Sequence, residues 1–84
     1  MIGLVHIFIN NNTVISLVYT SNKYMLEFMD DHNYSSEYFR NCKDALYIML
    51  DMVYNYALDG IRNGKDTFIR IYVDRDAYSK LCTE

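Results

Sequence analysis

The chain has 84 residues, of which 51% are hydrophobic, and its formal net charge is −3. This length allows one domain, spanning residues 1–84, and the apolar content excludes a disordered chain. The mildly acidic balance argues against unaided nucleic-acid binding, which needs a dense cationic surface, and so small a domain would gain stability from assembly.

Three strands are predicted at the start of the chain, at Ile2–Ile9, Thr13–Thr20 and Lys23–Asp30. All three segments are rich in β-branched and aromatic residues. Asn10–Asn12 and Ser21–Asn22 separate them, and asparagine accepts the positive φ of hairpin turns. The first third of the chain is therefore predicted to be a three-stranded meander.

A long helix is predicted from about Ser36 to about Arg62. Ser35 or Ser36 offers an N-cap, and Glu37 places negative charge in the first turn, where the helix dipole favours it. Gly60 and Asn63–Gly64 supply stop signals near the end, since glycine accepts the left-handed C-cap conformation. Apolar residues recur at spacings of three and four and form the expected core stripe: Phe39, Cys42, Leu46, Met49, Leu50, Val53 and Ala57.

A fourth strand is predicted at Thr67–Val73, followed by a short helix that Asp74 caps. A strand–helix–strand crossover is right-handed and would make this strand parallel to the third, beside the first. The expected fold is α+β with element order βββαβ(α). It has a four-stranded mixed sheet in the order 4-1-2-3, with the long helix on one face.

The two short turns predict the cross-strand register, with Ile7 opposite Ile15, Leu17 opposite Leu26, and Ser16 opposite both His6 and Glu27. One face then carries no charge and should receive the helix: Val5, Ile7, Ile9, Ile15, Leu17, Tyr19, Tyr24, Leu26, Phe28, Ile69, Ile71 and Val73. The opposite face holds Leu4, Phe8, Val14, Val18, Met25, Met29, Phe68 and Tyr72, crossed by a polar row of Arg70, His6, Ser16 and Glu27.

This second face predicts a homodimer, because its excess apolar surface needs a cover and a two-fold axis would bring Arg70 to Glu27 of a second copy. The expected interface is Leu4, His6, Phe8, Ser16, Val18, Met25, Glu27, Phe68, Arg70 and Tyr72. Two alternatives remain open at this point. The C-terminal helix could fold over the face with Tyr78 and Leu81, or another protein could cover it.

No catalytic, cofactor or metal residue is expected. His6, Ser16 and Glu27 lie in the wrong order for a nucleophilic triad, which needs the histidine between the serine and the carboxylate. Adjacent residues such as Asp30–His32 rarely converge on one ion, so this segment is interpreted as a polar loop. The protein is therefore not expected to be an enzyme.

Two cysteines, Cys42 and Cys82, have no metal-ligand spacing. Cys42 falls on the apolar side of the predicted helix, as a small buried hydrophobe. Both thiols are expected to be reduced, in the cytoplasm. No apolar run approaches the ~20 residues of a membrane span, so no membrane partner is expected.

The solvent side of the predicted helix carries an acidic stripe, with carboxylates about every two turns: Glu37, Asp44, Asp51 and Asp59. Tyr47 and Ile48 lie within this stripe and could anchor a partner. An ordinary solvated helix face is the alternative interpretation. The six residues together form the predicted partner-binding surface.

Residues with AT-rich codons are abundant, tyrosine occurs nine times, and proline and tryptophan are absent. In this composition the chain resembles the small accessory and anti-defence proteins of AT-rich bacteriophages, many of which inhibit host proteins by binding them. The resemblance implies an inhibitor of a host defence protein or host enzyme, acting through the acidic stripe in the host cytoplasm. The alternative is a nucleic-acid-binding module that uses Phe8, Phe68, Arg70 and Tyr72.

Overall fold

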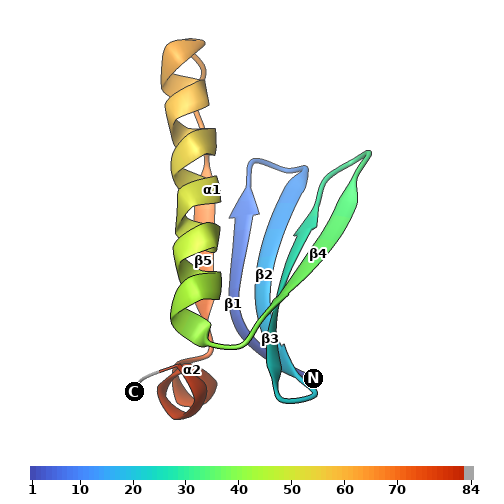
Figure 1. Ribbon diagram of the computed structural model, residues 1–84. Helices are drawn as coiled ribbons and strands as arrows, with labels where there is room; N and C mark the ends of the chain where they lie inside the picture. Colours follow the sequence, from blue (N-terminus) through green and yellow to red (C-terminus); the bar gives the residue numbers. More distant parts are fainter. Residues whose placement is uncertain (83–84) are drawn as a thin grey trace.

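The computed structural model describes residues 1–82 and shows one five-stranded sheet with a long helix on one face (Figure 1). In chain order the elements are β1 (Ile2–Ile9), β2 (Thr13–Thr20), β3 (Lys23–Met29), β4 (Tyr34–Phe39), α1 (Cys42–Arg62), β5 (Ile69–Val73) and α2 (Arg75–Leu81). The strands lie in the order β4-β3-β2-β1-β5, and all neighbours are antiparallel. The predicted α+β class is confirmed.

The N-terminal meander has the predicted strands and the predicted register. Ile7 lies opposite Ile15, and Ser16 lies opposite both His6 and Glu27. The turn between β2 and β3 has positive φ at both Ser21 and Asn22, as a tight hairpin turn requires. The turn chemistry and the apolar alternation therefore agree on one register.

The predicted start of the long helix is wrong, because Tyr34–Phe39 forms the additional strand β4, paired with β3. Aromatic residues alternate with polar ones along this segment, which suits an edge strand. The helix begins instead at Cys42, after the N-cap Asn41, whose side chain accepts the backbone N–H of Asp44 at 2.9 Å. Glu37 consequently lies on a strand and not in the first turn of α1.

The predicted four-stranded mixed sheet is also wrong, although β5 does lie beside β1. The pairing is antiparallel, with Ile7 opposite Ile71. Because β4 reverses the chain once more before α1, the crossover returns β5 parallel to β4, at the opposite edge of the sheet. The missed strand therefore also explains the wrong direction of β5.

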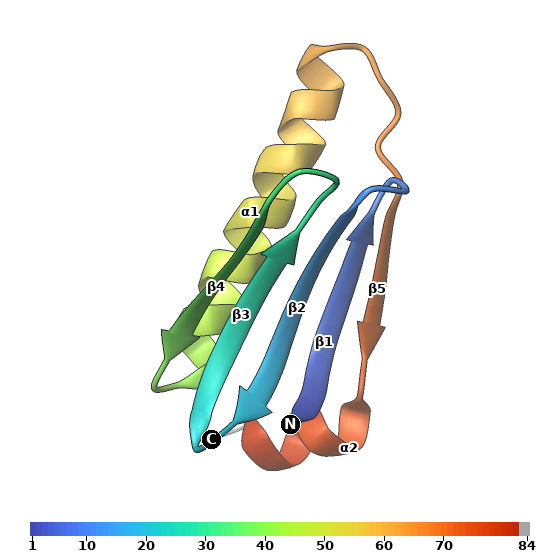
Figure 2. The same ribbon diagram turned by 90° about the vertical axis from the view of Figure 1, so that its right-hand side faces the viewer.

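The core lies between α1 and the facing side of the sheet. Ile7, Ile9, Ile15, Leu17 and Met49 are fully buried there. Helix α1 packs mainly on β2, β3 and β4 and leaves the β5 edge uncovered (Figure 2). For this reason Ile71 and Val73, predicted to lie under the helix, are 55% and 46% exposed.

Leu4 belongs to the core and not to the opposite face, so its predicted orientation is wrong. The register of β1 against β2 shifts between Gly3 and Val5, which makes Leu4 the extra residue of a β-bulge. Its side chain is fully buried within the core cluster. The bulge breaks the strict alternation on which the prediction depended.

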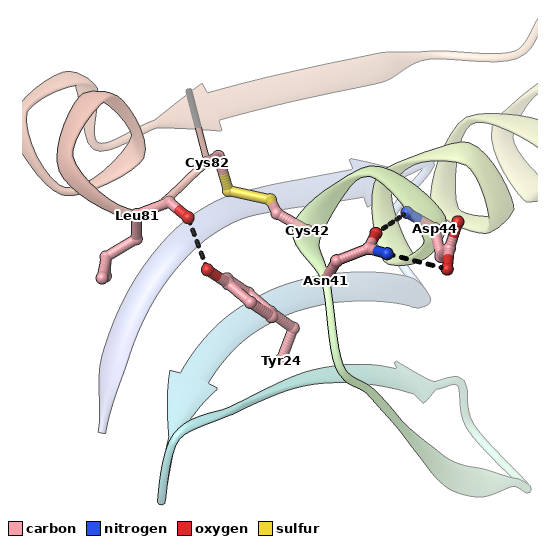
Figure 3. The surroundings of a disulfide bond; sticks show 6 residues. All are labelled: Tyr24, Asn41, Cys42, Asp44, Leu81 and Cys82. Carbon is pink, nitrogen blue, oxygen red and sulfur yellow. Dashed lines mark hydrogen bonds between the residues drawn. A yellow bond between two sulfur atoms is a disulfide. The ribbon is translucent and has the colours of Figure 1, made fainter. Parts of the chain in front are cut away.

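Helix α2 closes one end of the core and is tied to α1 by a Cys42–Cys82 disulfide, with a Cα–Cα distance of 5.3 Å (Figure 3). The Tyr24 hydroxyl donates a hydrogen bond to the Leu81 carbonyl beside it. The expectation of two reduced thiols is therefore wrong. The prediction of a reducing compartment depended on that expectation and loses its support from the sequence. Tyr78 and Leu81 pack on the core, so α2 does not cover the opposite sheet face.

Candidate interaction surfaces

The sheet face turned away from α1, here called the outer face, is covered by neither helix (Figure 2). Its most exposed large side chains are Met29, Tyr34, Tyr38, Phe68 and Tyr72. The excess of apolar strand surface in the sequence therefore corresponds to a real open face. This face is the first candidate surface for a partner.

A shallow hollow of about 450 Å³ lies on this face and is lined by His6, Phe8, Arg70 and Tyr72. The rings of Phe8 and Tyr72 meet edge to face, with centroids 5.6 Å apart. The Arg70 guanidinium lies 5.7 Å from the Phe8 ring centroid, in cation–π range. The hollow thus combines one cation with two aromatic rings.

The predicted polar row is only partly correct. His6 and Ser16 are adjacent, with 3.0 Å between Nδ1 and Oγ. Because β5 is antiparallel to β1, however, Tyr72 lies opposite His6, and Arg70 lies opposite Phe8, outside the row. The structure therefore does not place Arg70 in line with Ser16 and Glu27.

Glu27, at the other end of the predicted row, accepts a hydrogen bond from the Tyr34 hydroxyl at 2.6 Å. This bond to a carboxylate raises the pKa of Tyr34 above its ordinary value of 10.0. Glu27 is thus engaged within its own chain, by Tyr34 on β4. An ion pair with Arg70 of a second copy would have to compete with this contact.

The predicted sheet-face interface is smaller in the structure than expected. Leu4 is in the core, and Val18 and Met25, although they belong to the outer face, are buried at 3% and 7% exposure. Phe68 and Tyr72 remain well exposed. The sheet-face homodimer stays a prediction, with less apolar area available to it.

The acidic stripe of α1 consists of three carboxylates, Asp44, Asp51 and Asp59, because Glu37 is not on the helix. Tyr47 is 73% exposed and Ile48 is 38% exposed. Asp44 also has a local role, since its carboxylate accepts the Asn41 side-chain amide at 3.1 Å (Figure 3). Tyr47, Ile48 and Asp51 are the stripe residues most free of such a role.

The Asp30–His32 segment forms the turn between β3 and β4. Asp30 Oδ1 accepts the backbone N–H groups of His32 and Asn33 at 2.9 and 2.8 Å. These two bonds, that of His32 first, lower the pKa of Asp30 below 3.8. Within residues 1–82 no group of three or more His, Cys, Asp and Glu side chains is placed to hold a metal ion.

A further surface, at the β5 edge, was not predicted from the sequence. Ile71 and Val73 point to the helix side of the sheet but lie beyond the strands that α1 covers. Alternation predicts the face of a side chain, whereas coverage depends on where α1 lies.

No helix in the described part of the chain is long and apolar enough to cross a membrane.

Comparison of the chain with protein-family models, with curated proteins and with solved structures finds no significant match. The proposals that follow are supported by the residues and their geometry.

Proposed function

We propose that this protein is a non-enzymatic interaction module that inhibits a host defence protein or a host enzyme by occupying its surface. The observation that carries the proposal is the exposed pair Tyr47 and Ile48 on α1, set beside the carboxylate of Asp51. Exposed apolar residues that lie together and are bordered by polar ones mark many protein–protein interaction sites. The phage-like composition supports a target in the host.

Such a surface suits a target with an apolar pocket in a basic surround. An aromatic anchor that becomes fully desolvated contributes most of the binding energy at many interfaces. Carboxylates around it, Asp51 and Asp59 here, increase the rate of association with a positively charged surface and select the partner. If the target lies in a reducing host cytoplasm, Cys42 and Cys82 of this protein would be reduced when it binds the target.

The test is capture of host proteins on the immobilised protein, followed by an activity assay of the captured protein. The variant Tyr47→Ala/Asp51→Lys should lose both capture and inhibition. Asp44 is left unchanged because its reversal would also disturb the start of α1. Tyr38→Ala is the matched control, since Tyr38 is 56% exposed on the outer face of the sheet, away from α1. Equal inhibition by the wild type and the double variant would exclude this surface.

Nucleic-acid binding on the outer face is the second candidate. The supporting observation is the hollow in which Arg70 lies over Phe8 and Tyr72 meets the same ring, since aromatic rings and arginine stack on bases. Fluorescence anisotropy with single-stranded DNA and RNA at rising salt would test it, because phosphate contacts weaken steeply with salt. Binding that is absent, or that is unchanged in Tyr72→Ala, would exclude this candidate.

A further inference from the structure

One side of β5 is unpaired. The sheet ends at this strand, and within residues 1–82 no other strand lies beyond it (Figure 2). The other side of β5 faces β1, and a backbone hydrogen bond joins the two chain segments just beyond each end of β5. The Asn10 N–H donates to the Phe68 carbonyl at 2.7 Å, and the Asp74 N–H donates to the Leu4 carbonyl at 3.0 Å.

These two bonds determine which backbone groups of β5 point away from the sheet. In antiparallel pairs, hydrogen-bonded and non-bonded positions alternate along a strand. Phe68 and Asp74 bond toward β1, and so do the alternate residues between them, Arg70 and Tyr72. Ile69, Ile71 and Val73 therefore direct their N–H and C=O groups outward. The free edge presents three donors and three acceptors in alternation.

The two edges of the sheet differ in how they discourage pairing with another chain. Proteins protect edge strands with charges, proline or bulges. β4 carries Ser35 and the charged Glu37 on its helix-facing side. β5 carries one charge, Arg70, on the outer face, whereas its helix-facing side chains are Ile69, Ile71 and Val73, all apolar. On its helix-facing side β5 therefore lacks the protection that β4 has.

We infer that β5 pairs with β5 of a second copy, antiparallel, about a two-fold axis at Ile71. The two sheets then form one continuous sheet. Ile71 lies opposite Ile71 of the second copy, and Ile69 lies opposite Val73. Each outward N–H of one strand meets an outward C=O of the other, so no outward group of Ile69, Ile71 or Val73 is left unpaired.

The side chains select this register over its neighbours. With the axis at Ile71, Arg70 lies opposite Tyr72 of the second copy, a favourable guanidinium–aromatic pair. With the axis at Arg70, two guanidinium groups face each other and only two of the three outward residues find a partner within the strand. With the axis at Tyr72, Ile69 would lie opposite Arg75, which already belongs to α2.

This edge-to-edge dimer is independent of the proposed target and differs from the sheet-face dimer, so variants can separate the two arrangements. Ile71→Pro removes an N–H that bonds nothing within the chain, and Ile71→Lys adds charge at the same place without a backbone change. Met29→Asp is the control for the outer face, because Met29 is 49% exposed there and lies on β3, which β2 and β1 separate from β5. Circular dichroism verifies that each variant is folded.

Sedimentation equilibrium should give twice the chain mass for the wild type and for Met29→Asp, and the chain mass for Ile71→Pro and Ile71→Lys. A monomeric wild type would overturn the inference and leave the edge open to a strand of another protein. A dimer that survives Ile71→Lys but not Met29→Asp would also overturn it, in favour of the sheet face.

Cysteine crosslinking tests the register. Residues that face each other in a hydrogen-bonded antiparallel pair have Cα atoms about 5.5 Å apart, within disulfide range. Ile71→Cys should therefore crosslink to itself on mild oxidation, with the Cys42–Cys82 disulfide already closed. Ile69→Cys should crosslink only when mixed with Val73→Cys. Efficient self-crosslinking of Ile69→Cys alone would overturn the register centred on Ile71.

Discussion

Cys42 and Cys82 join the first residue of α1 to the C-cap of α2. The two residues are 40 positions apart, so the bond closes a loop that contains α1 and β5. Beside it the Tyr24 hydroxyl of β3 donates to the Leu81 carbonyl (Figure 3). The end of the described chain is thus tied to the helix and to the sheet by two different bonds.

Reduction of this disulfide should lower the free energy of unfolding by about 2–4 kcal/mol, because the cross-link restricts the unfolded chain. Urea denaturation with and without a thiol reductant would measure the difference. The double variant Cys42→Ala/Cys82→Ala should be less stable than the oxidised wild type and insensitive to the reductant. Identical wild-type transitions under both conditions would contradict the prediction.

Asn41→Ala should cost about 1 kcal/mol, because the Asn41 side chain caps the N-terminus of α1. Ser36→Ala is the informative control. Ser36 was predicted as the cap but lies within the exposed strand β4, so its replacement should change the stability little. Chemical denaturation of both variants would decide between the two helix starts. A larger effect at Ser36 would contradict the structure.

Leu4→Ala should destabilise the protein by about 2–5 kcal/mol, as expected for a fully buried leucine. Met29→Ala provides the comparison, since Met29 is 49% exposed on the outer face, to which the sequence also assigned Leu4. Thermal or urea unfolding would give both values. Equal small effects would mean that the bulge at Leu4 does not turn this side chain inward.

Gly60→Ala should destabilise the protein. Helix propensity alone would predict the opposite, because it favours alanine over glycine by about 1 kcal/mol. A Cβ at this position would collide with the Thr67 side chain and lie 3.2 Å from the Lys65 carbonyl oxygen. In a Thr67→Ala background the same substitution should cost less. A double-mutant cycle of unfolding free energies tests this coupling, and simple additivity would argue against the close approach.

Asp30 should make stability depend on pH in acid. The N–H groups of His32 and Asn33 favour its carboxylate, so the pKa of Asp30 in the folded protein lies below the unfolded value near 3.8. The stabilisation is present above the unfolded pKa and is lost as the pH falls through the folded one. Asp30→Asn should show a shallower loss of stability on acidification. The same acid profile in both proteins would contradict this.

The meander and its register were predictable because two independent signals agreed. The turns at Asn10–Asn12 and Ser21–Asn22 set the loop lengths, and the apolar alternation on both sides matched them. The segment from Tyr34 to Phe39 had no such agreement. Serines followed by a glutamate suit a helix N-terminus, and the same residues suit an exposed edge strand, so local sequence did not distinguish the two.

The candidate surfaces were predictable in part. The outer face and the exposed Tyr47 and Ile48 follow from periodicity, which gives the direction of a side chain on its own element. The position of Arg70 relative to His6 depends on the direction of β5, and that direction depended on β4. The exposure of Ile71 and the disulfide depend on where α1 and α2 lie, which is tertiary information that local patterns do not contain.

The covalent ring closed by Cys42 and Cys82 divides the chain into parts that respond differently to a protease. Gly64, with φ of 65°, lies in the open loop between α1 and β5, inside the ring. A single cut there leaves one covalently connected molecule for as long as the disulfide persists. A cut at Arg40, just outside the ring, would separate the four-stranded meander from the two helices and β5. The oxidation state of one bond thus decides whether the first nick in that loop divides the protein into two chains.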